Sequence, residues 1–122
     1  MSISVSVSGI KNALNFLDKK ESNVVSKSKE GLTKAAIFLQ GEVKSSIAGQ
    51  RSEHVSVDTG RFLNSVDFAV GKEDAMVFSS LDYAKFLEWG TSKFTGRRHF
   101  NNSKDRNRGK VKDIMQAEID SI

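Results

Sequence analysis

The chain has 122 residues, carries a formal net charge of +4 and contains neither cysteine nor proline. Its length fits one domain over residues 1–122, and the missing thiols exclude a disulfide scaffold and thiolate metal sites. The longest apolar run, residues 35–39, is far shorter than the about 20 residues of a membrane helix, so we expect a soluble protein made in a cytoplasm.

The N-terminal third of the chain predicts a strand followed by two helices. Ile3, Val5 and Val7 alternate with serines, which is the period of a strand with one buried face. Residues 10–17 carry apolar side chains at helical spacing and predict a short amphipathic helix. A second apolar stripe over residues 21–48 predicts a helix about 40 Å long. This stripe consists of Val24, Val25, Leu32, Ala35, Ala36, Leu39, Val43 and Ile47.

Glycines fall inside and just after this long helix. Gly49 is expected to end it, because glycine readily adopts the left-handed conformation that follows many helices. Gly31 and Gly41 lie inside it, where each lowers helix stability by about 1 kcal/mol relative to alanine. They mark a close approach of another backbone, a mild bend, or positions at which glycine is simply tolerated.

The central segment predicts an exposed loop, a capped turn and a hairpin. Residues 50–56 are polar and predict the loop. Asp58 is expected to cap a short turn, because its carboxylate can accept from the amides that follow. Residues 65–70 and 75–80 have the composition of two strands joined by a tight turn at 71–74.

The last third of the chain predicts two helices separated by a loop. Asp82 is expected to cap a short helix that runs through Glu88. Residues 91–110 predict a mobile loop, after which Asn102 or Ser103 caps a final helix. We therefore expect an α+β fold in which a long N-terminal helix packs on a small antiparallel sheet, with a short helix and a C-terminal helix.

Two sequence blocks flank the predicted hairpin. The first is Asp58-Thr59-Gly60-Arg61-Phe62-Leu63-Asn64-Ser65, and the second is Tyr83-Ala84-Lys85-Phe86-Leu87-Glu88-Trp89-Gly90-Thr91. In this order they resemble the tail-completion and head–tail joining proteins (minor tail components) of tailed bacteriophages and prophages. The pattern of that family is Asp-Thr-Gly-Arg-Leu-x-x-Ser, a hairpin, and Tyr-Ala-x-x-x-Glu-x-Gly-Thr. The resemblance gives as scaffold residues Asp58, Thr59, Gly60, Arg61, Ser65, Tyr83, Glu88, Trp89, Gly90 and Thr91.

The resemblance implies structural work in a virion and no enzymatic activity. Members of the family look like subunits of a ring, commonly hexameric, that completes the tail or joins it to the head while DNA passes through. The implied partners are phage tail and connector proteins and further copies of the chain, with no cofactor and no membrane. The chain departs from the family before its last helix, where residues 98–102 stand in place of a proline-containing stretch.

A cluster of basic residues defines the alternative function. Between residues 97 and 112 seven cations accompany a single carboxylate, Asp105. The cations are Arg97, Arg98, Lys104, Arg106, Arg108, Lys110 and Lys112. Such a cluster binds phosphate backbones or an acidic protein surface, or is only a solvated loop. The alternative function is a small nucleic-acid-binding module that uses segment 97–112.

Three other groups of residues give weak signals of a catalytic or metal-binding site. Asp58-Thr59-Gly60 also occurs in aspartic proteases, but Arg61 places a cation where two aspartates would have to pack, and those proteases are almost entirely β. His54 and His99 have no carboxylate beside them at metal-ligand spacing. Arg97-Arg98-His99 is a weak hint of a basic nuclease.

Three side chains near the second block have specific expected roles. Glu88 and Arg61 are expected to pair at about 2.7–3.2 Å, or else to be unrelated surface charges. Trp89 is expected to fill a corner of the core, with Gly90 permitting a sharp exit from the helix. Tyr83 is expected either to pack its ring on the core or to anchor a neighbouring subunit.

Overall fold

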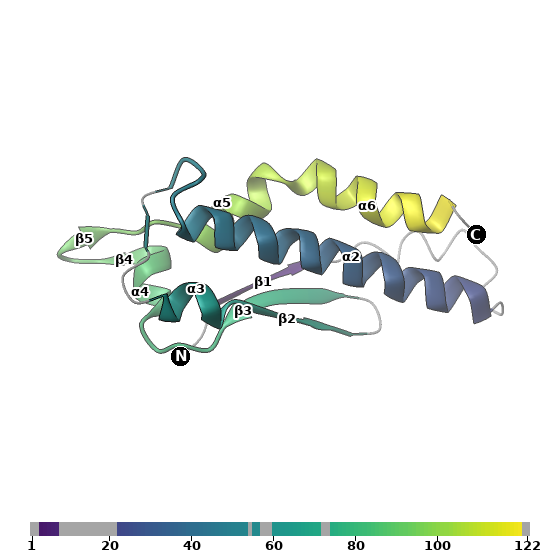
Figure 1. Ribbon diagram of the computed structural model, residues 1–122, viewed down its shortest axis with the longest axis horizontal. Helices are drawn as coiled ribbons and strands as arrows, with labels where there is room; N and C mark the ends of the chain where they lie inside the picture. Colours follow the sequence, from purple (N-terminus) through teal and green to yellow (C-terminus); the bar gives the residue numbers. More distant parts are fainter. Residues whose placement is uncertain (1–2, 8–21, 54, 57–59, 72–73, 121–122) are drawn as a thin grey trace.

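Figure 1 shows a computed structural model of the chain, which has the expected α+β fold. A long helix lies between a small sheet on one side and the C-terminal helices on the other, and a short hairpin projects at one end. The structure describes residues 3–7, 22–53, 55–56, 60–71 and 74–120. The helix expected over residues 10–17 and the expected cap at Asp58 lie outside these ranges.

The sheet has three antiparallel strands in the order β1-β3-β2. They are β1 (Ile3–Val7), β2 (Asp67–Val70) and β3 (Ala75–Ser79), so the predicted strand and hairpin are confirmed. Val77 in the central strand is fully buried and lies opposite both Val5 and Phe68. The apolar face of the sheet therefore rests on the long helix.

Helix α2 (Ser22–Ile47) supplies more of the described core than any other element, and its described part confirms the predicted stripe. Its fully buried residues are Leu32, Ala35, Ala36, Leu39, Val43 and Ile47. The side chains of Val24 and Val25 lie outside the described part of the structure. Gly49 follows the helix with a φ of 84°, as expected of a glycine that ends a helix.

The glycines inside α2 have different explanations. A Cβ on Gly31 would lie 3.3 Å from Cβ of Glu118 and 3.6 Å from Cα of Met115, both in helix α6 (Arg108–Asp120). Gly31 therefore marks a close approach of two backbones. A Cβ on Gly41 would meet nothing within 4 Å, so glycine is simply tolerated there.

Two short helices follow the loop and the hairpin. Helix α3 (Arg61–Ser65) begins after Gly60, whose φ of 81° is left-handed. Helix α4 (Ala84–Trp89) begins after Tyr83 and has no side-chain cap. The predicted cap at Asp82 is wrong, because the N-cap residue of this helix is Tyr83, one position further along the chain.

The expectation of a mobile loop over residues 91–110 is wrong. This stretch contains the end of β4 (Gly90–Thr91), all of β5 (Phe94–Thr95), all of α5 (His99–Arg106) and the start of α6. Asn102 and Ser103 lie inside α5 instead of capping the final helix. The physical reason is that Phe100 is fully buried and anchors α5 to the core.

None of the described helices is long and apolar enough to cross a membrane.

Candidate functional site

The two motif blocks meet at the ring of Phe62. This ring is buried, and its centroid lies 6.1 Å from that of Tyr83 with an angle of 60° between the planes. The rings of His99 and Phe100 lie 6.1 and 6.3 Å away on α5. Phe62 thus joins α3, α4 and α5 at one end of the molecule. Tyr83 makes the expected core contact while it remains 39% exposed, so the second expected role is still a prediction.

Ser65 fastens α3 to the end of the sheet. Its hydroxyl donates to the carbonyl of Phe62 at 2.6 Å and lies 2.7 Å from the hydroxyl of Ser79. Ser79 is fully buried, and its hydroxyl also accepts from the amide of Leu81 at 3.3 Å. The serine of the first block therefore has a structural role in the turn.

Glu88 is fully buried, and its carboxylate binds the N-terminus of α5. Oε1 accepts from the amide of Phe100 at 2.9 Å. Oε2 accepts from the amide and the side-chain amide of Asn101 at 2.8 and 2.7 Å. These bonds satisfy donors that a helix leaves open at its start, where the helix dipole also favours a negative charge. Glu88 is therefore a cap supplied by a different helix.

The predicted pair between Arg61 and Glu88 is wrong. Arg61 is exposed on α3, whereas the carboxylate of Glu88 is fully buried against α5. The sequence holds one signal of the real arrangement, because residues 96–98 offer no Ser, Thr, Asp or Asn to cap a helix. Arg98 stands at the N-cap of α5 with a left-handed φ of 52° and no side-chain cap, so this helix needs a capping group from elsewhere.

The hairpin of β4 and β5 is held tightly against the end of α4. Gly90 leaves the helix with a φ of 86°, and the hydroxyl of Thr91 accepts from the amide of Lys93 at 3.0 Å. After the hairpin, the amide of Arg97 donates to the carbonyl of Leu87 at 2.7 Å. This close return places the start of α5 beside Glu88.

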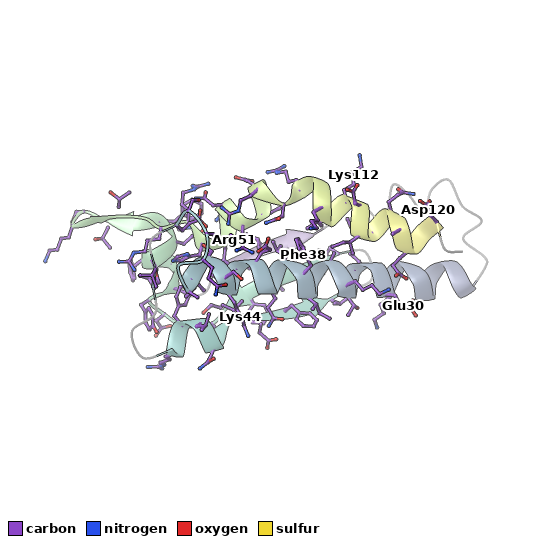
Figure 2. The ribbon with its side chains drawn as sticks, turned by 45° about the horizontal axis from the view of Figure 1, so that its top comes forward. Glu30, Phe38, Lys44, Arg51, Lys112 and Asp120 are labelled. Carbon is purple, nitrogen blue, oxygen red and sulfur yellow. The ribbon has the colours of Figure 1, made fainter. Side chains whose placement is uncertain are left out.

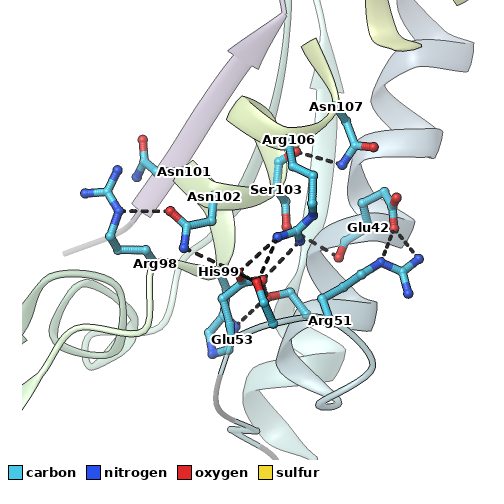
Figure 3. Close-up of polar contacts among 12 residues, drawn as sticks. Glu42, Arg51, Glu53, Arg98, His99, Asn101, Asn102, Ser103, Arg106 and Asn107 are labelled. Atoms are coloured by element: carbon cyan, nitrogen blue, oxygen red, sulfur yellow. Dashed lines mark hydrogen bonds and ion pairs between the residues drawn. The ribbon is translucent and has the colours of Figure 1, made fainter. Parts of the chain in front are cut away.

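Most described residues of loop 50–56 are exposed, as expected, but the loop carries one buried carboxylate, which was not predicted from the sequence. Glu53 is 9% exposed, and two nitrogens of Arg106 each donate to it at 3.0 Å (Figure 3). Ser46 and Ser52 donate to it at 2.5 and 2.7 Å. Burial alone raises the pKa of Glu53, but the hydrogen bonds, led by that of Arg106, outweigh it and lower the pKa to about 2. The loop is therefore tied to α5.

A chain of hydrogen bonds runs from Arg97 to Glu53 through a fully buried histidine. Arg97 donates to the hydroxyl of Ser56 at 2.8 Å, and that hydroxyl lies 2.6 Å from Nε2 of His99. Nδ1 of His99 lies 2.8 Å from Ser46, whose hydrogen goes to Glu53. Nδ1 must therefore donate to Ser46, because the hydrogen of the Ser46 hydroxyl is used for Glu53. His99 has a structural role here.

Most cations of segment 97–112 are paired within the molecule. Arg98 donates to Asn102 at 3.0 Å, and Arg108 pairs with Asp105 at 2.9 Å. Arg97 and Arg106 belong to the network of Glu53 described above. The cations of this segment without a hydrogen bond or ion pair in the described structure are Lys104, Lys110 and Lys112.

Helix α4 and its N-cap residue expose three aromatic side chains. Tyr83, Phe86 and Trp89, which we call the aromatic face, are 39%, 45% and 55% exposed. The expected burial of Trp89 is wrong, because Ala84 and Glu88 take the buried positions of this six-residue helix.

Cations accompany two of these exposed rings. Nζ of Lys85 lies 5.1 Å from the ring centre of Phe86, and the guanidinium of Arg98 lies 5.0 Å from that of Trp89. The described residues contain no group of three His, Asp or Glu side chains that could hold a metal ion. The end of the molecule around α4 therefore exposes three aromatic rings, two of which have a cation beside them.

Comparisons with protein-family models, with curated proteins and with solved structures find no match for this chain.

Proposed function

We propose that the chain is a structural virion protein of a tailed phage or prophage that completes the tail or joins it to the head as a subunit of a ring. The observation that carries the proposal is the structural role of the motif residues in the fold. Phe62, Ser65 and Glu88 build a rigid junction, and the same junction displays the aromatic face to solvent. Exposed Trp and Tyr with a neighbouring Arg are typical of protein interfaces.

The same contacts argue against a catalytic role for the motifs. Glu88 has its two oxygens engaged by the start of α5, and His99 is fully buried between two serines. A catalytic centre requires reactive groups that converge on a space open to a substrate.

The proposed partners are phage tail and connector proteins and further copies of the chain. The proposed location is the head–tail junction, with DNA passing through the ring.

Deletion of the gene from a phage that encodes this chain tests the proposal. We expect tails and DNA-filled heads to accumulate separately in electron micrographs, and the wild-type gene supplied in trans to restore joined particles. The polypeptide should be present in purified wild-type virions. Normal yields of joined, infectious particles from the deletion, or virions without the polypeptide, would overturn the proposal.

A pair of variants links this test to the aromatic face. The double variant Phe86→Ser/Trp89→Ser should fold, since both side chains are largely exposed, yet fail to restore joined particles. Ile37→Ser on α2 is a matched control, because it removes an apolar side chain that is 52% exposed and lies outside the motif blocks. We expect this control to restore joining.

A further inference from the structure

Strand β2 forms a free edge of the sheet. The strand order is β1-β3-β2, and among the described residues no other strand pairs with β2 on its outer side. In Figure 1 and Figure 2, the hairpin of β2 and β3 lies on the side of α2 opposite to α6, so the C-terminal helix does not cover it. An uncovered edge strand offers backbone donors and acceptors to a strand of another molecule.

The hydrogen-bonding pattern of the hairpin shows which residues of β2 face outward. The amide of Gly71 donates to the carbonyl of Asp74 at 2.7 Å, so these opposed residues form a hydrogen-bonded pair. Along an antiparallel ladder, such pairs alternate with pairs that lack these bonds. The backbone groups of Phe68 and Val70 therefore point away from β3 and form the outer edge.

This outer edge is suited to pair with the same edge of a second copy. Two β2 strands that run antiparallel about a two-fold axis at Ala69 place Phe68 of one copy opposite Val70 of the other. These two residues would exchange backbone hydrogen bonds, and an aromatic side chain opposite a β-branched one stabilises such a pair. Because the axis repeats the contact on its other side, a second copy fits this edge twice over.

Two side chains occupy the edge in the folded chain. Oδ1 of Asp67 accepts from the amide of Phe68 at 2.8 Å, which is a donor that a second strand would need. Nε2 of Gln40 in α2 donates to the carbonyl of Val66 at 2.9 Å, directly before the strand begins. Asp67 is exposed, so its contact fills no space in the core.

We propose that Asp67 closes the free edge of the sheet against strand pairing with a second copy. Its carboxylate takes the amide of Phe68, and the two-fold axis repeats this loss on the other side of the paired edge. Val70 then has no donor opposite its carbonyl on either side. This inference goes beyond the proposed function and does not depend on it.

Cysteine cross-linking at the two-fold axis tests this inference, because the chain contains no cysteine of its own. Position 69 lies opposite itself in the paired edge, at a Cα separation of about 4.5 Å that permits a disulfide. Under diamide, purified full-length Ala69→Cys should stay largely uncross-linked, whereas Ala69→Cys/Asp67→Val should form a disulfide-linked dimer. The concentration at which half of the chains cross-link should fall by more than about tenfold, because the released amides form additional hydrogen bonds.

Asp67→Asn is the matched control, because its side-chain oxygen still accepts from the amide while the charge is gone. Ala69→Cys/Asp67→Asn should therefore cross-link as little as Ala69→Cys. Ala117→Cys/Asp67→Val, with its cysteine exposed on α6, should also stay uncross-linked. Circular dichroism should show that the variants fold, and Asp67→Ala should act like Asp67→Val, which keeps the test valid if valine disturbs the fold.

Three results would overturn the inference. They are equal cross-linking at position 69 with and without Asp67, no cross-linking in either case, and an effect of asparagine as large as that of valine. The last result would mean that charge, and not the hydrogen bond to Phe68, keeps the edge from pairing.

Discussion

Glu53 and Glu88 are both buried carboxylates, yet they are stabilised by different kinds of group. Glu88 accepts from two backbone amides and one side-chain amide at the start of α5. Glu53 accepts from the guanidinium of Arg106 and from serine hydroxyls. A helix start is a fixed array of donors, whereas the contact with Arg106 is an ion pair that protonation of Glu53 removes. Acid is expected to weaken the fold at Glu53, because protonation of its carboxylate removes this ion pair.

Protonation of Glu53 is expected to destabilise the folded chain at low pH. Its pKa falls from the ordinary 4.5 to about 2 in the folded state. Because the folded pKa is lower than the unfolded one, the stabilisation is complete above about pH 4.5 and is lost as the pH falls through about 2. The shift corresponds to roughly 3 kcal/mol.

Urea unfolding of wild type and of Glu53→Gln checks this prediction. The difference between their free energies of unfolding should be larger at about pH 7 than at about pH 3, because only wild type loses the charge. Arg106→Gln removes the leading favourable contact and should reduce the pH dependence. A difference that is the same at both pH values would contradict the assignment.

At the scale of elements, the spacing of apolar residues was sufficient to predict the segments that bury one face. It predicted β1, the long helix α2 and the hairpin of β2 and β3, because their apolar residues recur with the period of the structure. It failed at α5, whose start carries Arg97 and Arg98 and no local capping side chain. That helix depends on a carboxylate in α4 and on the burial of Phe100, which are contacts between elements.

The candidate site was only partly predictable for the same reason. The sequence identified the two blocks that meet at the ring of Phe62. It could not tell which face of α4 is buried, since six residues are too few for a clear period. The outward position of Trp89 and the inward position of Glu88 follow from where α5 returns along α4.

Gly96 is expected to be essential for the junction between α4 and α5. A Cβ at this position would lie 2.5 Å from the carbonyl oxygen of Glu88 and 2.7 Å from that of Trp89, and it would also meet the carbonyl carbon of Trp89. All three are backbone atoms, so none of them can move away by rotation of a side chain. We expect Gly96→Ala to reduce the free energy of unfolding by about 2 kcal/mol or more.

Gly41→Ala is the matched control for this substitution. A Cβ at Gly41 meets nothing within 4 Å, and the position lies inside α2. This change should raise stability by up to about 1 kcal/mol, because alanine favours the helix. Thermal unfolding of both variants checks the prediction. Equal and small effects at the two positions would show that the chain does not return along α4 as described.

At the scale of the whole molecule, the charge distribution bears on the alternative function. The cluster over residues 97–112 looks like a nucleic-acid-binding segment in the sequence, but its four arginines are held by partners in the fold. Pairing lowers the number of cations that can release counterions from DNA. A subunit of a ring through which DNA passes also has to let the duplex slide, which weak contacts permit.

Duplex DNA is therefore expected to bind weakly and with a shallow salt dependence. Only Lys104, Lys110 and Lys112 of the cluster lack a hydrogen bond or ion pair in the described structure. With about 0.9 ions released per phosphate contact, the slope of log affinity against log salt should not exceed about 3 in magnitude.

Fluorescence anisotropy with a labelled duplex between about 50 and 200 mM salt measures this slope. Replacing the three lysines by alanine should remove the remaining binding, whereas Arg108→Ala should change it little, because Asp105 already neutralises that arginine. A slope near 6, with tight binding at physiological salt, would mean that the arginines leave their partners for phosphate. In that case the nucleic-acid-binding function would replace the structural one, since a ring subunit that grips DNA this strongly would oppose its passage.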